Sequence, residues 1–307
     1  MNKARCSPPA GPGTQRSMAG APTRHRYVSG RPHWWQWPTV LSLDAPLVAV
    51  AWQAMLARAA RVTLGGHHVF ILGAAVWLAY AADRWIEGWR LDPAQILTQR
   101  HWFYRRWRWP VAVTWLIVLA VALIVTASRL TKGELAGGFI LLTPVLVYLL
   151  SHQLIHRDHP WRAPKELCVG LLFGAGVACF PVAGSWTVLT NIAAPLVLFG
   201  LLCFANCALI SLWEDEVDRT HGQTSFALQF PRGRPLVRAL PWLIAGAGLM
   251  AAIRENGAPA GASWCAGASG ALLGAVDLLH RQLGRQLSRV LADAVLLTPC
   301  LVLGLNR

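Results

Sequence analysis

A chain of 307 residues would ordinarily fold as two soluble domains, but its composition argues against that. Apolar residues make up 55% of the chain and charged residues only 14%, whereas a soluble domain carries about 25% charged residues. So high an apolar content also excludes disorder over most of the chain. The sequence therefore predicts an all-α, polytopic membrane protein.

The N-terminal residues 1–37 differ from the rest because Pro, Gly, Ser and Arg dominate them. They lack the apolar core of a secretory signal peptide. We expect a disordered basic tail over 1–37, followed by one transmembrane domain over 38–307.

Nine segments after the tail are long and apolar enough to cross about 30 Å of hydrocarbon. The first is the weakest because it contains Asp44 and Gln53. The predicted spans are 40–58, 64–82, 110–128, 135–152, 166–184, 188–213, 236–253, 258–279 and 288–305.

The distribution of positive charge predicts the orientation of these spans. With a cytoplasmic N-terminus, 22 of the 28 Lys and Arg residues fall on the cytoplasmic side. The net charge of +14 is then explained by membrane topology, so we expect no nucleic-acid partner. The predicted location is the inner cell membrane, with the protein in contact with lipid.

Six of the 14 acidic residues fall in two short windows at the cytoplasmic ends of spans. Asp83 and Glu87 follow the second span, and Glu214 and Asp218 follow the sixth, each pair spaced i, i+4 on one helix face. Two carboxylates about 6 Å apart repel by roughly 3 kcal/mol at an effective dielectric near 20. A Mg²⁺ ion bound with phosphate oxygens would remove that repulsion.

Nearby basic residues complete this candidate site. They could neutralise a diphosphate, or could simply pair with the acids at the membrane surface. These residues are Arg84, Arg90, Arg100, Arg162, Lys165 and Arg219. The presence of two similar windows on one side favours a shared diphosphate site over two unrelated surface clusters.

The two windows resemble the acidic motifs of the UbiA superfamily of intramembrane prenyltransferases. The first family motif, N-D-x-x-D-x-x-x-D, is matched by Asp83, Arg84 and Glu87, while Ala79 and Tyr80 replace its first two members. The second motif is matched by Glu214, Asp218, Arg219 and Gly222, with Ser211 in place of the leading Asp. The stretch from Lys165 to Gly176 is similar to the Gly-rich entry of the family's fifth helix.

The resemblance implies a nine-helix bundle and transfer of an isoprenoid from a polyprenyl diphosphate to a hydrophobic, aromatic or lipid acceptor. It implies that Mg²⁺ on Asp83, Glu87, Glu214 and Asp218 stabilises the leaving diphosphate. Arg84, Arg162, Lys165 and Arg219 would bind the substrate phosphates. Asn206 would orient the acceptor or the diphosphate, or would bond to a neighbouring helix.

Three alternatives remain at this point. Because both motifs lack their first members, the chain could be a UbiA-fold protein without transferase activity. A transporter is less well supported because the acids cluster near one face. The spacing of His152, His156 and His159 suggests a third alternative, a membrane oxidase with a His-bound metal.

Overall fold

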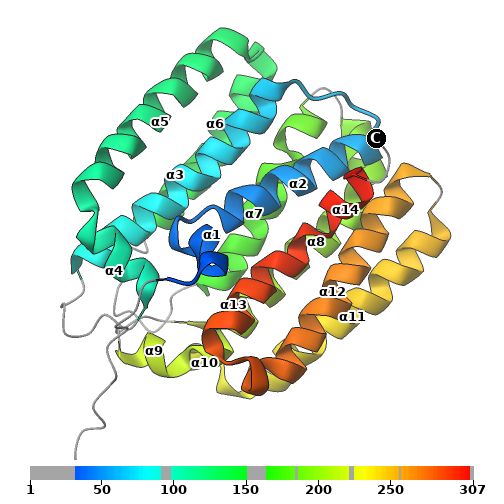
Figure 1. Cartoon of the computed structure of the whole chain (residues 1–307). Coiled ribbons are helices and arrows are strands. Elements are labelled where there is room, and N and C mark those ends of the chain that lie inside the picture. Colours follow the sequence, from blue (N-terminus) through cyan, green and yellow to red (C-terminus); the bar gives the residue numbers. More distant parts are fainter. Residues whose placement is uncertain are drawn as a thin grey trace, which may run out of the picture.

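The computed structural model describes residues 32–90, 98–150, 164–183, 186–220, 225–255 and 257–304. Every regular element in these ranges is a helix, which confirms the predicted all-α class (Figure 1). The described part begins inside the predicted tail, and residues 34–40 are already helical.

The first half of the bundle contains the elements that surround the candidate site. They are η1 (Trp34–Gln36), α1 (Trp37–Val40), α2 (Asp44–Ala59), α3 (Gly66–Arg90), α4 (Gln99–Arg106), α5 (Arg108–Arg129) and α6 (Lys132–Leu150). Two of them depart from the predicted pattern. Helix α4 lies in a stretch expected to be a basic loop, and α3 runs eight residues beyond the predicted end of its span.

The second half completes the bundle and returns the chain to the site. Its elements are α7 (Lys165–Val182), α8 (Trp186–Trp213), α9 (Asp215–Thr220), α10 (Phe226–Gln229), η4 (Pro231–Gly233), α11 (Arg234–Arg254), α12 (Ala258–Leu283), α13 (Arg285–Ala294), η5 (Val295–Leu297) and α14 (Thr298–Gly304). Gly284 joins α12 to α13 with φ +76°, a backbone conformation that glycine adopts without strain.

Seven segments of the described chain are long and apolar enough to cross a membrane. They are α3, α5, α7, α8, Pro231–Arg254 (which includes α11), α12 and the segment Arg285–Gly304. The helical pair Trp34–Val40 and Asp44–Ala59, bent by 79°, makes an eighth if it is counted as one span. The predicted count of nine is therefore not confirmed. The predicted span 135–152 overlaps α6, which is not among the seven.

Helices α2 and α8 form the centre of the bundle. The fully buried Trp52 of α2 stacks on Phe199 of α8, with ring centroids 4.5 Å apart. The Trp52 indole N–H donates to the carbonyl of Leu296, which ties α2 to the last helical segment. A buried indole needs such a partner. The stacking contact and the hydrogen bond together connect three segments that are distant in sequence.

The helix ends that carry the acidic windows meet at one end of the bundle. The C-terminal ends of α3 and α8 lie there together with α4, α9 and the start of α13 (Figure 1). The absence of a side chain at Gly88 allows α4 to approach α3, because a Cβ at that position would lie 3.2 Å from the carbonyl oxygen of His101. The fold thus brings distant charged segments to a single end.

Candidate functional site

A cavity of about 740 Å³ opens between α2, α3, α5, α6, α7 and α8, with side chains from α4, α9 and α13 at its charged end. Most of its wall is apolar. The charged residues that line it are Asp44, Asp83, Arg84, Glu87, Arg90, Arg100, Lys165, Glu166, Glu214, Asp218, Arg289 and Asp293. All four acids of the two sequence windows therefore line the same cavity.

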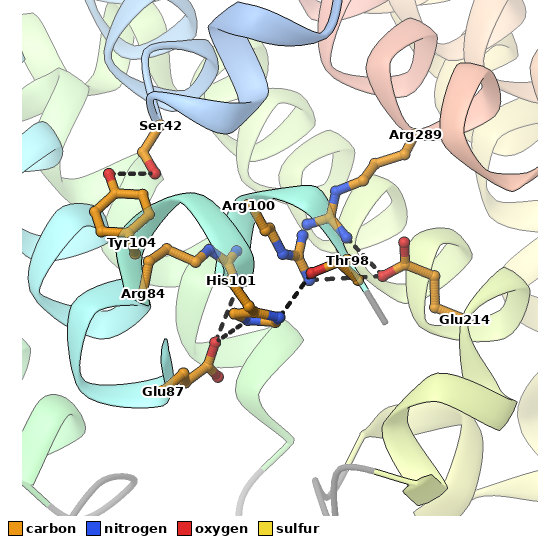
Figure 2. A network of polar contacts seen from close by, with 9 residues as sticks. All are labelled: Ser42, Arg84, Glu87, Thr98, Arg100, His101, Tyr104, Glu214 and Arg289. Carbon is orange, nitrogen blue, oxygen red and sulfur yellow. Dashed lines mark hydrogen bonds and ion pairs between the residues drawn. The ribbon is translucent and has the colours of Figure 1, made fainter. Parts of the chain in front are cut away.

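Glu87, in the last turn of α3, is held by two neighbouring side chains (Figure 2). Its Oε2 atom accepts from Arg84 Nη1 at 3.3 Å and from His101 Nε2 at 2.8 Å. The other ring nitrogen of His101, Nδ1, accepts from the hydroxyl of Thr98 at 2.7 Å. The carboxylate can only accept, so the proton of a neutral His101 is on Nε2.

His101 sits in α4 and is 1% exposed. Burial lowers its pKa to about 4, although the hydrogen bond to Glu87 opposes this shift. His101 is therefore neutral near pH 7 and acts as a hydrogen-bond donor to Glu87, without adding charge to the cavity.

Glu214 lies where α8 ends and α9 begins, and two arginines hold it. Its Oε2 atom is 2.5 Å from Arg289 Nη1 of α13 and 3.7 Å from Arg100 Nη2 of α4 (Figure 2). The helical i, i+4 register continues through this junction, because the backbone N–H of Asp218 donates to the carbonyl of Glu214. Glu214 and Asp218 therefore lie on one face, as their spacing predicts.

The two arginines retain hydrogen-bonding capacity beyond Glu214. Nε and Nη1 of Arg100 and Nε of Arg289 are buried and have no hydrogen-bond partner among the described residues. Buried N–H groups are rarely left unpaired, so these donors indicate space for an additional acceptor. Burial lowers the pKa of the Arg100 guanidinium, and nearby Arg84 lowers it further, against the effect of Glu214. An anion bound here would accept hydrogen bonds from these N–H groups and would favour the charged form of Arg100.

The structure separates the predicted substrate-binding residues into three groups. Arg84, Lys165 and Asn206 line the cavity. Arg219 does not, because its side chain is 64% exposed and faces Asp215 at 3.8 Å. Arg162 lies outside the described residues.

Three charged cavity residues, Glu166, Arg289 and Asp293, were not found by sequence reasoning. Arg289 and Asp293 lie one turn apart on α13, which begins the last predicted span. The only available signal was a basic residue followed by an acid at the cytoplasmic start of an apolar segment. The contact between Arg289 and Glu214 spans 75 positions in sequence, and spacing alone does not reveal it.

The Mg²⁺ ion that the resemblance implies does not fit the four acids as they are arranged. Glu87 and Glu214 each use Oε2 to bind two cationic or N–H groups. Among the described residues, no group of three or more His, Cys, Asp or Glu side chains could hold a metal ion. We therefore derive no chemical step through a metal, and Mg²⁺ dependence stays a prediction for experiment.

The main motif of the histidine alternative, formed by His152, His156 and His159, lies outside the described residues. The remaining pair, His67 and His68, lies at the start of α3. There His68 Nε2 is 2.8 Å from Glu134 of α6, and His68 Nδ1 accepts from the backbone N–H of Gly65. These contacts join two helix ends, and they account for His68 without a metal.

Comparison of the chain with protein-family models, curated proteins and solved structures found no match. The likeness to the UbiA superfamily thus stays a prediction from the two motifs.

Proposed function

We propose that the protein is a membrane-embedded prenyltransferase that transfers an isoprenoid from a polyprenyl diphosphate to a hydrophobic acceptor. The observation that carries the proposal is a cavity with an apolar wall and a charged end, where four arginines and a lysine lie among seven acidic side chains. Its volume of about 740 Å³ falls within the range of roughly 300–1,000 Å³ found for small-molecule sites.

The apolar wall supports binding of a lipid chain. Leu123 of α5 and Phe139, Leu142 and Leu146 of α6 line the cavity and have exposed side chains. Among the described residues, α5 packs on α3 and α6 packs on α7, while α5 and α6 share no comparable contact. A chain could therefore pass from the bilayer into the cavity between these two helices.

The charged end supports binding of the diphosphate. Arg100 and Arg289 present buried N–H groups that have no partner in the described part of the chain, and Arg84 and Lys165 line the same cavity. Guanidinium groups form short, charge-assisted hydrogen bonds with phosphate oxygens. In a cavity with a mostly apolar wall, these cations stabilise the negative charge that develops as the allylic C–O bond breaks.

In the proposed reaction, the electron pair of the C–O bond passes to the departing diphosphate. The allylic carbon then bonds to a carbon or heteroatom of the acceptor, and the proton that the acceptor loses passes to the released diphosphate. The apolar walls limit hydrolysis of the allylic cation.

A second cavity supports the same assignment by offering a polar exit. It has a volume of about 330 Å³, and Arg100, Glu214 and Arg289 line both cavities. Its other lining residues are mostly polar, among them Gln36, Thr98 and Gln286. A released diphosphate is highly charged and needs such a route to water.

The test uses membranes that contain the protein, radiolabelled geranyl, farnesyl and geranylgeranyl diphosphates, and a panel of aromatic and quinone-precursor acceptors, with and without EDTA. We expect transfer that falls at least tenfold in Arg100→Met. Arg106→Met is the matched control, since Arg106 lies on the same helix, is exposed and does not line the cavity.

The outcomes separate the remaining alternatives. Binding of prenyl diphosphate without transfer to any acceptor would indicate a protein that retains the fold but not the activity. Complete loss of transfer in EDTA would restore the metal-dependent mechanism that the UbiA resemblance implies. Equal loss in Arg100→Met and Arg106→Met would remove the argument from the cavity.

A further inference from the structure

The last turns of α3 carry different residues on two opposite sides. Asp83 and Glu87 line the cavity, and Trp85 and Trp89 each follow one of these acids by two residues. Two residues correspond to roughly 200° around a helix, so the tryptophans lie on the side of α3 away from the acids. Trp89 is 52% exposed. The outer side of α3 is therefore aromatic, and the acids of this helix belong to the cavity.

Arg108, the first residue of α5, is held against this outer side by tryptophans (Figure 1 shows α3, α4 and α5 meeting at this end of the bundle). Its carbonyl accepts from the indole N–H of Trp85 at 3.0 Å. Its Cζ atom lies 5.2 Å from the centre of the Trp89 ring and 5.7 Å from the centre of the Trp109 ring. Such cation–π contacts position a guanidinium group without using its N–H groups as hydrogen-bond donors.

The positive charge of Arg108 is not neutralised by the described part of the chain. Arg108 is exposed, and its side chain forms no hydrogen bond or ion pair with a described residue. The sequence contains no Asp or Glu between residues 98 and 133, a range that includes all of α4 and α5. The exposed indole N–H groups of Trp89 and Trp109 also lack a described partner. This surface therefore offers positive charge and hydrogen-bond donors to an anion outside the protein.

An exposed apolar strip continues from this surface along α5. Val113 and Ile117 follow Trp109 at intervals of four residues, and their side chains are 56% and 58% exposed. At 1.5 Å per residue, Ile117 lies roughly 12 Å from Trp109 along the helix. One leaflet contributes about 15 Å to the hydrocarbon core. The strip thus has the length that an acyl chain needs when its headgroup lies at Arg108.

We propose that Arg108, Trp89 and Trp109 bind the headgroup of an anionic glycerophospholipid. The guanidinium donates to the phosphate oxygens, the indole N–H groups donate to phosphate or ester oxygens, and an acyl chain lies along Val113 and Ile117. A zwitterionic headgroup also carries an ammonium group, which the local positive charge repels, so the site prefers a lipid with net negative charge. None of these residues lines the cavity, and the site does not depend on the proposed function.

The test is native mass spectrometry of the purified full-length protein in detergent, titrated with dioleoyl phosphatidylglycerol or with dioleoyl phosphatidylcholine. The two lipids share their acyl chains and differ in headgroup charge. The first phosphatidylglycerol molecule should bind at least tenfold more tightly than the first phosphatidylcholine molecule. Arg108→Gln should reduce this preference to twofold or less, because the group that donates to the phosphate is removed.

Arg106→Gln is the matched control. Arg106 is exposed at the same end of the bundle, but its guanidinium lies over the Trp107 ring. This variant removes the same charge and should keep at least a fivefold preference. Arg108→Lys keeps the charge without the planar set of N–H donors and should give an intermediate preference. If Arg108→Gln does not fold, the double variant Trp89→Leu/Trp109→Leu removes the rings that position Arg108 and should also lose the preference.

Equal affinity for the two lipids in the unmodified protein would overturn the inference, as would a preference that survives Arg108→Gln. Equal loss in Arg106→Gln would overturn it in favour of a general attraction of anionic lipid to the basic surface. Displacement of phosphatidylglycerol by millimolar glycerol 3-phosphate would overturn it in favour of a site for soluble phosphate. Since neither lipid is a prenyl diphosphate, failure here leaves the proposed function intact, and a protein without transfer activity can still show the lipid preference.

Discussion

Helices α11 and α12 are in contact along much of their length, whereas α5 and α6 stand apart on the other side of the bundle (Figure 1). On the first side, glycines allow the backbones to touch. A Cβ at Gly248 would lie 2.6 Å from the backbone nitrogen of Gly267. On the second side, large apolar residues such as Ile124, Ile140 and Val147 are exposed on the helix surfaces.

Apolar surface therefore has two roles in this bundle, helix packing on one side and contact with lipid or ligand on the other. Close packing of small residues is a main source of helix association in lipid, where the hydrophobic effect between helices is weak. Loosely associated helices leave room for a lipid chain and change position at small cost. We infer that α11 and α12 stabilise the fold and that α5 and α6 serve ligand entry.

The largest expected effect follows from closing the space on the tightly packed side. Gly248→Ala should destabilise the protein by about 3 kcal/mol, the upper part of the range for overpacking, because the atoms that the new Cβ meets belong to backbone. The measurement is unfolding by titration with SDS in mixed micelles. Gly246→Ala, two residues earlier on the same helix, meets nothing within 4 Å and should leave stability equal or slightly higher.

An effect of similar size, visible only at acidic pH, is expected at His101, which lies at the charged end of the cavity. Burial holds the pKa of His101 at about 4, while an unfolded histidine titrates near 6.5. Between these values the unfolded chain binds the additional proton. Stability is therefore complete above pH 6.5 and falls as the pH decreases to 4, by roughly 3 kcal/mol.

The matched variant for this prediction is His101→Gln, whose amide can still donate to Glu87. The difference in stability between the unmodified protein and the variant, measured from pH 7 to pH 4, should shrink or reverse over this window. A difference that stays constant with pH would mean that His101 does not titrate as its burial indicates.

The smallest effect on stability is expected on the loosely packed side. Leu123 lines the cavity but is 60% exposed, so Leu123→Ala should change the free energy of unfolding by no more than about 0.5 kcal/mol. The affinity of the Leu123→Ala variant for farnesyl thiodiphosphate, a slowly reacting substrate analogue, should fall about threefold, because the contact between Leu123 and the isoprenoid chain is lost. Leu116→Ala, an exposed position on α5 that does not line the cavity, should change neither quantity.

The features that the sequence predicted correctly are those set by local spacing. Long apolar runs predict helices because lipid requires every backbone hydrogen bond to be made within the segment, so the positions of α3, α5, α7 and α8 were predictable. The i, i+4 acids were also placed correctly on common faces. Local spacing carries both kinds of information.

What the sequence could not predict are contacts between distant segments. Arg100 was identified as a nearby basic residue, but its position beside Glu214, which Arg289 also contacts, depends on α4, a short helix in a stretch expected to be a loop. His101 gave no signal, because its role comes from its contact with Glu87. Arg219, by contrast, fits the motif and yet its side chain points to Asp215 outside the cavity.

The central claim is that the arginines at the charged end of the cavity, Arg100 and Arg289, hold the diphosphate. The most direct measurement is the affinity of the purified protein for farnesyl thiodiphosphate in EDTA, compared with the same measurement in Mg²⁺. We predict that Arg100→Met weakens binding at least tenfold in both conditions. Binding that is unchanged in Arg100→Met under either condition would contradict the claim.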